Sequence, residues 1–351
     1  MNNDKNNSMH ISSQLQKIYL YTFIFITVVI SAISLYLMLG RKNTQSSSMS
    51  TNSNNSERAF LSDDLATNTS ISSIDLDEII GGGPGKDGIP ALSNPSFTSV
   101  DDAGPNITDN VNGIVVKVNS EVRYYPYNIL VWHEIVNDII QGQSIVISFC
   151  PLCGSAVVFD PTIDGEVLTF GVSGKLYESN LLMYDNKTES LWSQILGEAV
   201  VGDFTEKKLE LKTFQIFTFG ELKVRYPDAK ILSEDTGFNR DYSFYPYGDY
   251  DTNERIFYPV SVDDKRLPAK EIMYIVNVDE KSVAFVQKDL REIGIVELTV
   301  DSVDIKAEVE DDKIFVKRLD TDEVIPGYFA MWFSWATHHQ EDGVVWSKDS
   351  S

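Results

Sequence analysis

The sequence is poor in the residues that build most metal sites and disulfides. It has 2 cysteines and 4 histidines among 351 residues, and 29 basic against 52 acidic side chains, for a formal charge of −23. Two cysteines exclude a disulfide-rich scaffold. The shortage of positive charge disfavours nucleic acid as a partner, because such binding depends on neutralising phosphates. The length allows a large core in one or two domains.

Long uncharged hydrophobic runs are also scarce, with one exception at residues 19–40. This run has no charged residue and is long enough to span a bilayer as one helix. We expect a single-pass anchor in the cell membrane, with residues 1–18 as a short cytoplasmic tail. Residues 41–73 are rich in Ser, Thr and Asn and predict a flexible linker. The extracytoplasmic domain is therefore expected over residues 74–351.

Within that domain, short runs of β-branched residues alternate with turn clusters, which predicts a β-rich α+β fold. Helical patterns are scarcer, and the clearest cover residues 127–138, 214–226 and 329–339. The tract at residues 81–90 is rich in Gly but lacks the context of a phosphate-binding loop, so we expect a mobile surface loop.

A weak internal similarity predicts a degenerate two-lobed repeat. Residues 118–130 resemble residues 278–290, and residues 218–228 resemble residues 332–342. The halves would cover about 74–250 and 251–351, and only the first would contain the cysteines.

The two cysteines lie in the turn sequence Cys150-Pro151-Leu152-Cys153-Gly154, between two strand-like runs. This context differs from the strand-to-helix context of a thioredoxin-like site. It is typical of a knuckle, in which two thiolates face one metal ion. Three interpretations stay open at this point: half of a metal site, one local disulfide that is redox-active, and a pair of inert thiols.

A metal site needs further ligands, because zinc prefers four donors, whereas Cu(I) accepts fewer and softer ones. His133 is the best candidate for a third ligand, since it precedes the strand that ends at Cys150. His10 lies in the predicted tail, and the adjacent His338 and His339 would point about 100° apart on a helix. The metal prediction is therefore zinc or copper at Cys150, Cys153 and His133.

A second segment, residues 168–194, combines glycines and aromatic rings with hydrogen-bonding side chains, as small-molecule pockets do. The residues that we expect to form such a pocket are Arg123, Glu134, Tyr177, Ser179, Asp185, Trp192 and Gln194.

These motifs resemble a widespread bacterial and archaeal family of unknown function. The resemblance rests on an Ile-Pro-Ala-Leu opening at residues 89–92, a Tyr-Pro…Trp-His-Glu-Ile-Val-Asn-Asp box at 125–138, the cysteine turn, and a box from Ser173 to Gln194 that ends in Ser-Leu-Trp-Ser-Gln. It covers roughly residue 80 to the C-terminus. It implies an exported or anchored domain and supplies no reaction.

The leading hypothesis is a membrane-anchored extracytoplasmic domain that binds a metal ion through its Cys-x-x-Cys turn. The alternatives are a thiol–disulfide redox protein using the same cysteines, and a non-catalytic module that binds a small molecule or a protein.

Overall fold

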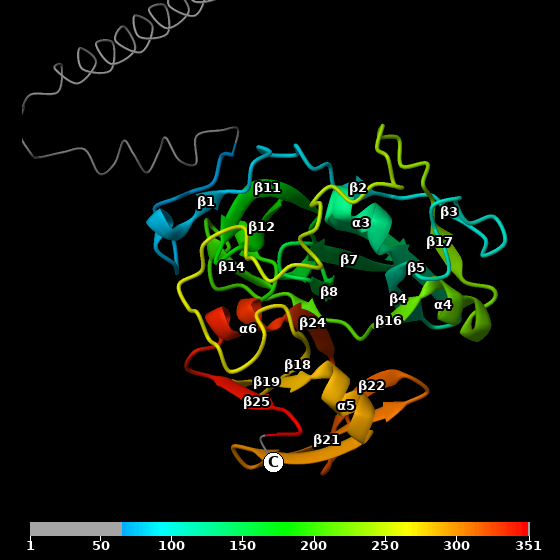
Figure 1. The fold of residues 1–351 in the computed structure, drawn as a ribbon. Helices are drawn as coiled ribbons and strands as arrows, with labels where there is room; N and C mark the ends of the chain where they lie inside the picture. Colours follow the sequence, from blue (N-terminus) through cyan, green and yellow to red (C-terminus); the bar gives the residue numbers. More distant parts are fainter. Residues whose placement is uncertain (1–64, 350–351) are drawn as a thin grey trace, which may run out of the picture. The chain divides into compact units, whose positions relative to one another are not determined.

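The computed structural model describes residues 65–349, and strands dominate this part of the chain (Figure 1). The expectation of a β-rich α+β fold is confirmed. Within these residues, no helix is long and apolar enough to cross a membrane. The predicted tail and anchor at residues 1–40, together with His10, lie outside the described residues. The end of the predicted linker is described, and it already pairs with the domain, since Ser72 forms a β-bridge with Val201.

Two sheets form the larger part of the fold, and antiparallel hairpins form the centre of each. The first sheet has the order β16 (Gln215–Thr218), β4 (Asn112–Val118), β5 (Glu121–Pro126), β17 (Lys230–Leu232) and β3 (Phe97–Thr98). The second has the order β2 (Leu92–Ser93), β6 (Ile135–Ile140), β7 (Gln143–Cys150), β8 (Ser155–Asp160), β24 (Gly327–Met331), β18 (Ile272–Val278), β19 (Lys281–Val286) and β25 (Gly343–Trp346), with β15 (Glu210–Leu211) beside β8. Strands β7 and β8 lie inside this second sheet, which buries the cysteine hairpin.

Three further sheets within residues 65–349 have five, four and two strands. One has the order β1 (Ile80–Gly81), β11 (Phe170–Tyr177), β12 (Asn180–Asp185), β13 (Leu191–Ser193) and β14 (Glu198–Val201). Another has the order β20 (Ile295–Val300), β21 (Val303–Glu310), β22 (Lys313–Arg318) and β23 (Val324–Ile325), and β9 (Thr162–Ile163) pairs with β10 (Glu166–Val167). The helices are short: η2 (Leu76–Glu78), α3 (Tyr127–His133), α4 (Phe219–Arg225), α5 (Gln287–Ile293) and α6 (Trp332–His338).

The same order of elements occurs twice along the chain. The series β4, β5, α3, β6, β7 runs from Asn112, and the series β18, β19, α5, β20, β21 runs from Ile272, with element bounds that differ by 160 positions throughout. Each series is completed by a strand, a helix and a second strand, namely β16–α4–β17 and β24–α6–β25. The closing strands pair alike, because β17 is parallel to β5 and β25 is parallel to β19.

The helices are shorter than the sequence pattern predicts. The predicted helix at residues 127–138 ends at His133, because Glu134 adopts a left-handed conformation with φ 57°. Ile135, Val136, Ile139 and Ile140 then continue as β6, where β-branched side chains are favoured. The predicted helices at 214–226 and 329–339 likewise begin as strands β16 and β24 before α4 and α6 start.

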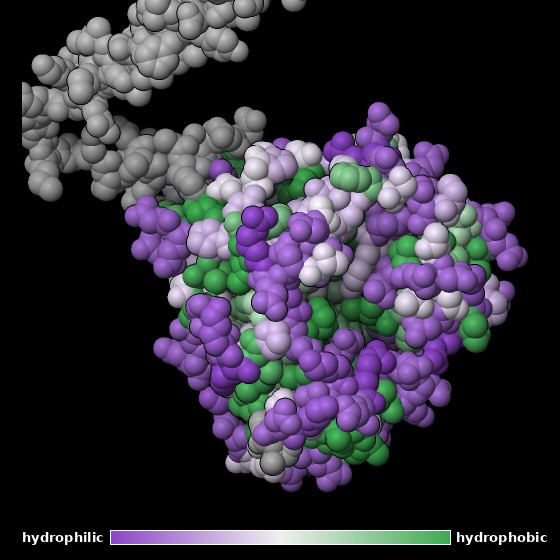
Figure 2. All heavy atoms as spheres, viewed as in Figure 1, coloured by the Kyte–Doolittle hydropathy of each residue, from purple (hydrophilic) through white to green (hydrophobic). Residues whose placement is uncertain are grey.

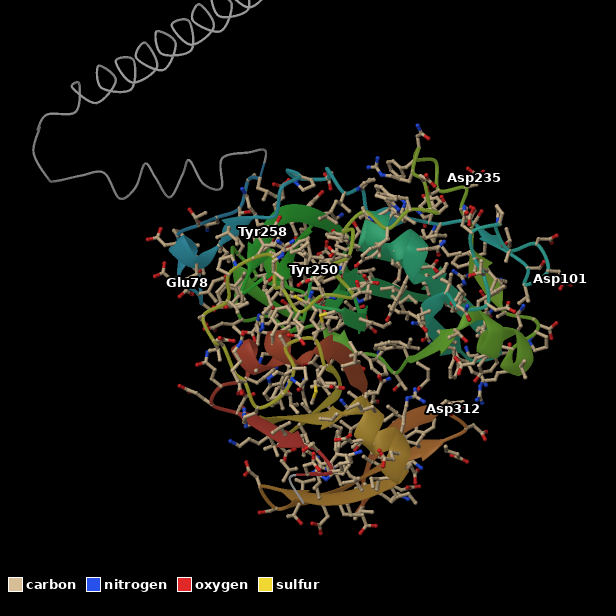
Figure 3. All side chains as sticks on the ribbon, in the orientation of Figure 1. Glu78, Asp101, Asp235, Tyr250, Tyr258 and Asp312 are labelled. Atoms are coloured by element: carbon tan, nitrogen blue, oxygen red, sulfur yellow. The ribbon has the colours of Figure 1, made fainter. Side chains whose placement is uncertain are left out.

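A long irregular segment joins the two series. Residues 233–271, here called the tyrosine segment, contain no helix or strand. Figure 1 draws much of it in yellow across the face that contains β11 and β12, and Figure 3 places Tyr250 and Tyr258 on it. Irregular segments of this length are uncommon in compact domains and are usually functional.

Candidate functional site

The cysteines lie at the tip of the β7–β8 hairpin, in the turn Cys150–Gly154, here called the cysteine turn. Cys150 pairs with Ser155 across the hairpin, and the Cys153 amide donates to the Cys150 carbonyl oxygen at 3.2 Å. The predicted meeting of two strands at this turn is therefore confirmed. The Met331 amide of β24 donates to the Cys153 carbonyl oxygen at 2.8 Å, which fixes the turn against the neighbouring strand.

Both cysteines are free thiols in the core. Cys150 is 1% exposed and Cys153 is 0% exposed. The Cys153 thiol donates to the Ser179 carbonyl oxygen at 3.2 Å, and the Cys150 side chain lies within hydrogen-bonding reach of Cys153. The two sulfurs therefore form one polar unit inside an apolar core.

The surroundings of the two sulfurs shift the pKa values of their thiols in opposite directions. Burial, reinforced by the neighbouring Cys153, raises the pKa of the Cys150 thiol well above its usual value. Burial also opposes ionisation of Cys153, but hydrogen bonds from Cys150, Ser334 and Asn180 outweigh it and lower the pKa of the Cys153 thiol. These surroundings therefore favour ionisation of Cys153 and oppose ionisation of Cys150.

Ser334 of α6 is one of the residues that lower the pKa of the Cys153 thiol. Its buried hydroxyl has no hydrogen-bond partner in the described residues, because the Cys153 thiol is bonded to Ser179 instead. The hydroxyl nevertheless lies close enough to Cys153 to stabilise the thiolate. A hydroxyl group rotates, so it can donate to Cys153 Sγ once that sulfur carries negative charge. An unpaired buried hydroxyl has a cost of about 1–3 kcal/mol, and this cost is recovered when the thiolate forms.

Glu134 brings a carboxyl group to the same site. It follows α3 directly and is 5% exposed, and its carbonyl oxygen accepts from the Phe149 amide of β7 at 2.9 Å. Burial raises the pKa of its carboxyl to about 7, although a hydrogen bond from the Tyr247 hydroxyl at 3.0 Å opposes the shift. Its charge acts on both sulfurs. At neutral pH it can therefore accept or release a proton beside the thiols.

His133 makes its hydrogen bonds away from the thiols. Its Nδ1 donates to the Pro90 carbonyl oxygen at 2.8 Å, and its Nε2 accepts from the Tyr242 hydroxyl at 2.8 Å. Burial lowers the pKa of its imidazole to about 4. With both ring nitrogens occupied, His133 does not join Cys150 and Cys153 as a ligand.

The three predicted metal ligands therefore do not form a set. Within residues 65–349, no group of three or more His, Cys, Asp or Glu side chains is arranged to hold a metal ion. A closed zinc site needs four such donors, so the residues that surround the sulfurs do not fit one.

The tyrosine segment covers the cysteine turn with hydroxyl contacts. The Tyr250 hydroxyl donates to the Leu152 carbonyl oxygen at 2.6 Å, and the Tyr247 hydroxyl bonds Glu134. The Lys270 ammonium lies 3.3 Å from the centre of the Tyr250 ring and donates to the Tyr250 carbonyl oxygen. The tyrosine segment therefore contributes to the burial of the cysteine turn.

Two hollows meet at the cysteine turn. The first, here called the Arg240 cavity, has a volume of about 380 Å³ and reaches Leu152 of the turn, with Glu134 and Arg240 in its wall. The second, of about 710 Å³, lies between α3 and α5 and reaches Pro151 and Gly154. Hydrophilic residues cover most of the face in Figure 2, and hydrophobic residues are visible in the recess between these helices.

The glycine-rich tract forms one wall of the Arg240 cavity. The Gly82 amide donates to the Gly174 carbonyl oxygen at 2.9 Å, and Gly82, Pro84 and Gly88 line the cavity. The expected surface loop is thus packed against β11. Gly174 makes this contact possible, because it has φ +74° and a Cβ there would lie 2.2 Å from the Pro84 carbonyl oxygen.

We expect Gly174→Ala to lower the free energy of unfolding by about 3 kcal/mol, through left-handed strain and displacement of the tract. Gly165→Ala is the matched control, because Gly165 has φ +83° and a Cβ there would have no atom within 4 Å. It should lose about 1 kcal/mol. Urea unfolding of both variants measures the difference, and equal losses would show that the contact with Pro84 does not matter.

The other predicted pocket residues occupy several places. Ser179 and Gln194 are brought to the cysteine turn, since Gln194 Oε1 accepts from the Ser155 hydroxyl at 2.6 Å. Asp185 and Trp192 bond each other at 2.9 Å in the core of the β11–β12–β13 sheet. Tyr177 lies edge-on to His338, with ring centroids 5.9 Å apart.

Arg123 forms ion pairs with Glu121 at 2.7 Å and with Asp138 at 2.5 Å. Of the predicted pocket residues, Glu134 is the one in the wall of the Arg240 cavity.

The residues that cover and polarise the thiols carry no recognisable motif in the sequence. Arg240, Tyr247 and Tyr250 belong to the tyrosine segment, and Ser334 and Asn180 contact Cys153 from distant elements. The only local signal was the five tyrosines between residues 242 and 258.

These features define a class: a β-rich domain with a buried pair of thiols under an irregular tyrosine-bearing segment. The chain belongs to the family described as "Protein of unknown function (DUF3179)", which matches residues 86–325. The match includes the cysteine turn, Glu134 and the tyrosine segment, and it ends before Ser334. No curated protein and no solved structure matches the chain.

Proposed function

We propose that the domain is a thiol–disulfide redox protein in which Cys153 is the attacking thiol and Cys150 the resolving one. The observation that carries the proposal is the contact of two buried thiols whose surroundings favour ionisation of one and oppose ionisation of the other. Thiolates are the nucleophiles of disulfide exchange, so a pair separated in this way has a defined order of reaction.

The exchange uses a disulfide of a small molecule or a protein as oxidant. The Cys153 thiolate attacks one sulfur, the substrate S–S bond breaks, and the departing sulfur takes up a proton while a mixed disulfide forms. Cys150 then gives its proton to Glu134 and attacks Cys153 Sγ, which releases the second substrate sulfur as a thiolate. Glu134 returns the proton to that thiolate. In total, the cysteine pair loses two electrons and two protons, and the substrate disulfide gains them.

Two further proposals concern the location of the domain and its internal repeat. The run at residues 19–40 supports a membrane anchor that holds the domain outside the cell, where thiol pairs meet oxidants. The recurring order of elements supports a degenerate two-lobed repeat, in which only the first lobe carries the cysteine turn. The second lobe then acts as scaffold and contributes Ser334 to the site.

The first test is the reduction potential of the pair in the full-length protein. Equilibration in glutathione buffers, with thiol titration after unfolding, should give a value well above about −300 mV, the upper range of structural disulfides. A lower value would mean that the two cysteines form a structural disulfide. Elemental analysis of the same sample tests the metal hypothesis, and stoichiometric zinc or copper lost in Cys150→Ser would overturn the redox proposal.

The second test is the order of reactivity. At pH 7, Cys153 in a Cys150→Ser variant should react with iodoacetamide at least tenfold faster than Cys150 in a Cys153→Ser variant. A tenfold ratio corresponds to about one unit of pKa. Both sulfurs are buried alike, so access does not explain a difference. In 6 M urea the two rates should become equal, and equal rates in the folded proteins would contradict the assignment of Cys153.

A further inference from the structure

Arg240 has an unusual environment for a cation in an acidic protein. Most arginines of the described part pair with a carboxylate, namely Arg123, Arg225, Arg266, Arg291 and Arg318. Arg255 makes no ion pair with the described residues but is exposed to water. Arg240 is half-buried and makes no ion pair with the residues that the structure describes.

The guanidinium group of Arg240 also has a donor without an acceptor. Its Nε is buried, and no hydrogen-bond partner for it lies within residues 65–349. Its one ring contact among these residues is with Trp132, at 5.8 Å from the ring centroid. Leaving a charged donor unsatisfied has a substantial energetic cost, so the position favours an acceptor from outside the described residues.

The cavity beside Arg240 indicates the rest of the ligand. Its volume of about 380 Å³ is within the range of about 300–1,000 Å³ that is typical of small-molecule sites. Val131, Val172 and Leu181 contribute apolar wall, and Trp132 adds an aromatic face. Lys175 contributes a second positive charge to the lining. A ligand that fits these walls has an apolar body and one anionic group.

Glu134 limits the charge that this ligand can carry. Its carboxyl belongs to the same cavity wall as Arg240. A dianion such as a phosphate monoester would be repelled by this carboxylate, whereas a monoanion can be held at Arg240. Carboxylates also match the planar donors of a guanidinium group.

We infer that the Arg240 cavity binds a small monocarboxylate, with its carboxylate on the Arg240 guanidinium and its apolar body against Trp132, Val131 and Leu181. This inference does not depend on the thiol chemistry. The ligand would lie against Leu152, on the cavity side of the cysteine turn.

The probe for the test is 3-phenylpropionate, with uncharged 3-phenylpropionamide as its matched analogue. Both are titrated into the full-length protein by isothermal titration calorimetry and saturation-transfer NMR at pH 7. We expect the acid to bind at least tenfold more tightly than the amide. In Arg240→Gln the affinity for the acid should fall at least tenfold and become equal to that for the amide.

Two variants complete the design. Arg266→Gln removes one positive charge from the same segment at an exposed ion pair, and it should leave binding unchanged. Arg240→Lys retains the charge without the guanidinium fork, and it should bind the acid with intermediate affinity. If Arg240→Gln does not fold, the affinities of the wild type and of Arg240→Lys for the acid and the amide still test whether the Arg240 guanidinium binds the carboxylate. Failure of the acid to bind at millimolar concentration, equal binding of acid and amide, or unchanged binding in Arg240→Gln would overturn the inference.

Discussion

Glu134→Gln is expected to stabilise the protein at pH 8 by roughly 3 kcal/mol. The folded state raises the pKa of this buried carboxyl from 4.5 to about 7, so the folded protein retains a proton that the unfolded chain has lost. This contribution to stability is fully present below pH 4.5 and is lost as the pH rises through 7. One unit of pKa corresponds to about 1.4 kcal/mol, which gives the expected size. Glutamine has no charge to bury and avoids the loss.

The measurement is the free energy of unfolding in urea at pH 4.5, 6 and 8. The gain of Glu134→Gln over the wild type should be near zero at pH 4.5 and largest at pH 8. Glu280→Gln, at an exposed carboxylate, is the matched control and should show no such trend. A variant that is less stable than the wild type at pH 8 would mean that ionised Glu134 is stabilised by a partner.

In the wild type, the free energy of unfolding should not fall in this way as the pH rises from 4.5 to 6.5. His133 gives a pH dependence of the opposite sign in that range. Burial lowers the pKa of its imidazole from 6.5 to about 4, so its contribution is present above pH 6.5 and is lost as the pH falls towards 4. Between pH 4.5 and 6.5 the two effects oppose each other. In Glu134→Gln nothing from residue 134 opposes the acid-side losses from His133 and from His338, whose pKa burial also lowers to about 4. Acidification should therefore destabilise that variant more steeply than the wild type.

Asp185→Ala should lower the free energy of unfolding by about 3–5 kcal/mol, because several donors lose their acceptor and each unsatisfied donor costs about 1–3 kcal/mol. Asp185 is 0% exposed and holds the β12–β13 turn together. Its carboxylate accepts from the Trp192 indole at 2.9 Å and from the amides of Lys187 and Thr188 at 3.0 and 2.7 Å. Alanine leaves the buried Trp192 indole and the partly buried amides of Lys187 and Thr188 without this acceptor.

Asp160→Ala is a matched control for Asp185→Ala. Asp160 also accepts from a turn amide, that of Thr162 at 3.0 Å, but its side chain is 29% exposed. Water can replace that bond, so the loss should be about 1 kcal/mol. A double-mutant cycle of Asp185→Ala with Trp192→Phe should give a coupling energy of about 1.5–3 kcal/mol. A loss below about 1 kcal/mol for Asp185→Ala would contradict the structural role assigned to Asp185.

The strands around the cysteine turn could be predicted because their signals are local. Ser144 to Phe149 and Ala156 to Phe159 are rich in β-branched and apolar residues, and both form strands. The predicted helix at residues 127–138 was too long, since its apolar period continued into Ile135 and Val136, which pair with β7 instead. Pairing partners far along the chain decide such cases, and sequence periodicity does not contain them.

The environment of the thiols could not be predicted for the same reason. Tyr250, Asn180 and Ser334 come from different parts of the chain and meet only in the fold. His133 is close to the cysteines in sequence order and was a reasonable ligand on that basis. Its ring nitrogens are bonded instead to Pro90 and Tyr242, and no local pattern places these two residues beside it.

The order in which the site is completed has a consequence for biogenesis. Chains are made from the N-terminus, and domains generally form in that order. The β7–β8 hairpin is synthesised long before the tyrosine segment that covers it, and Ser334 follows nearly at the end. A nascent chain that has made this hairpin but not α6 leaves Cys150 and Cys153 without their cover. The oxidants and reductants present during synthesis thus reach this pair before the finished fold covers it.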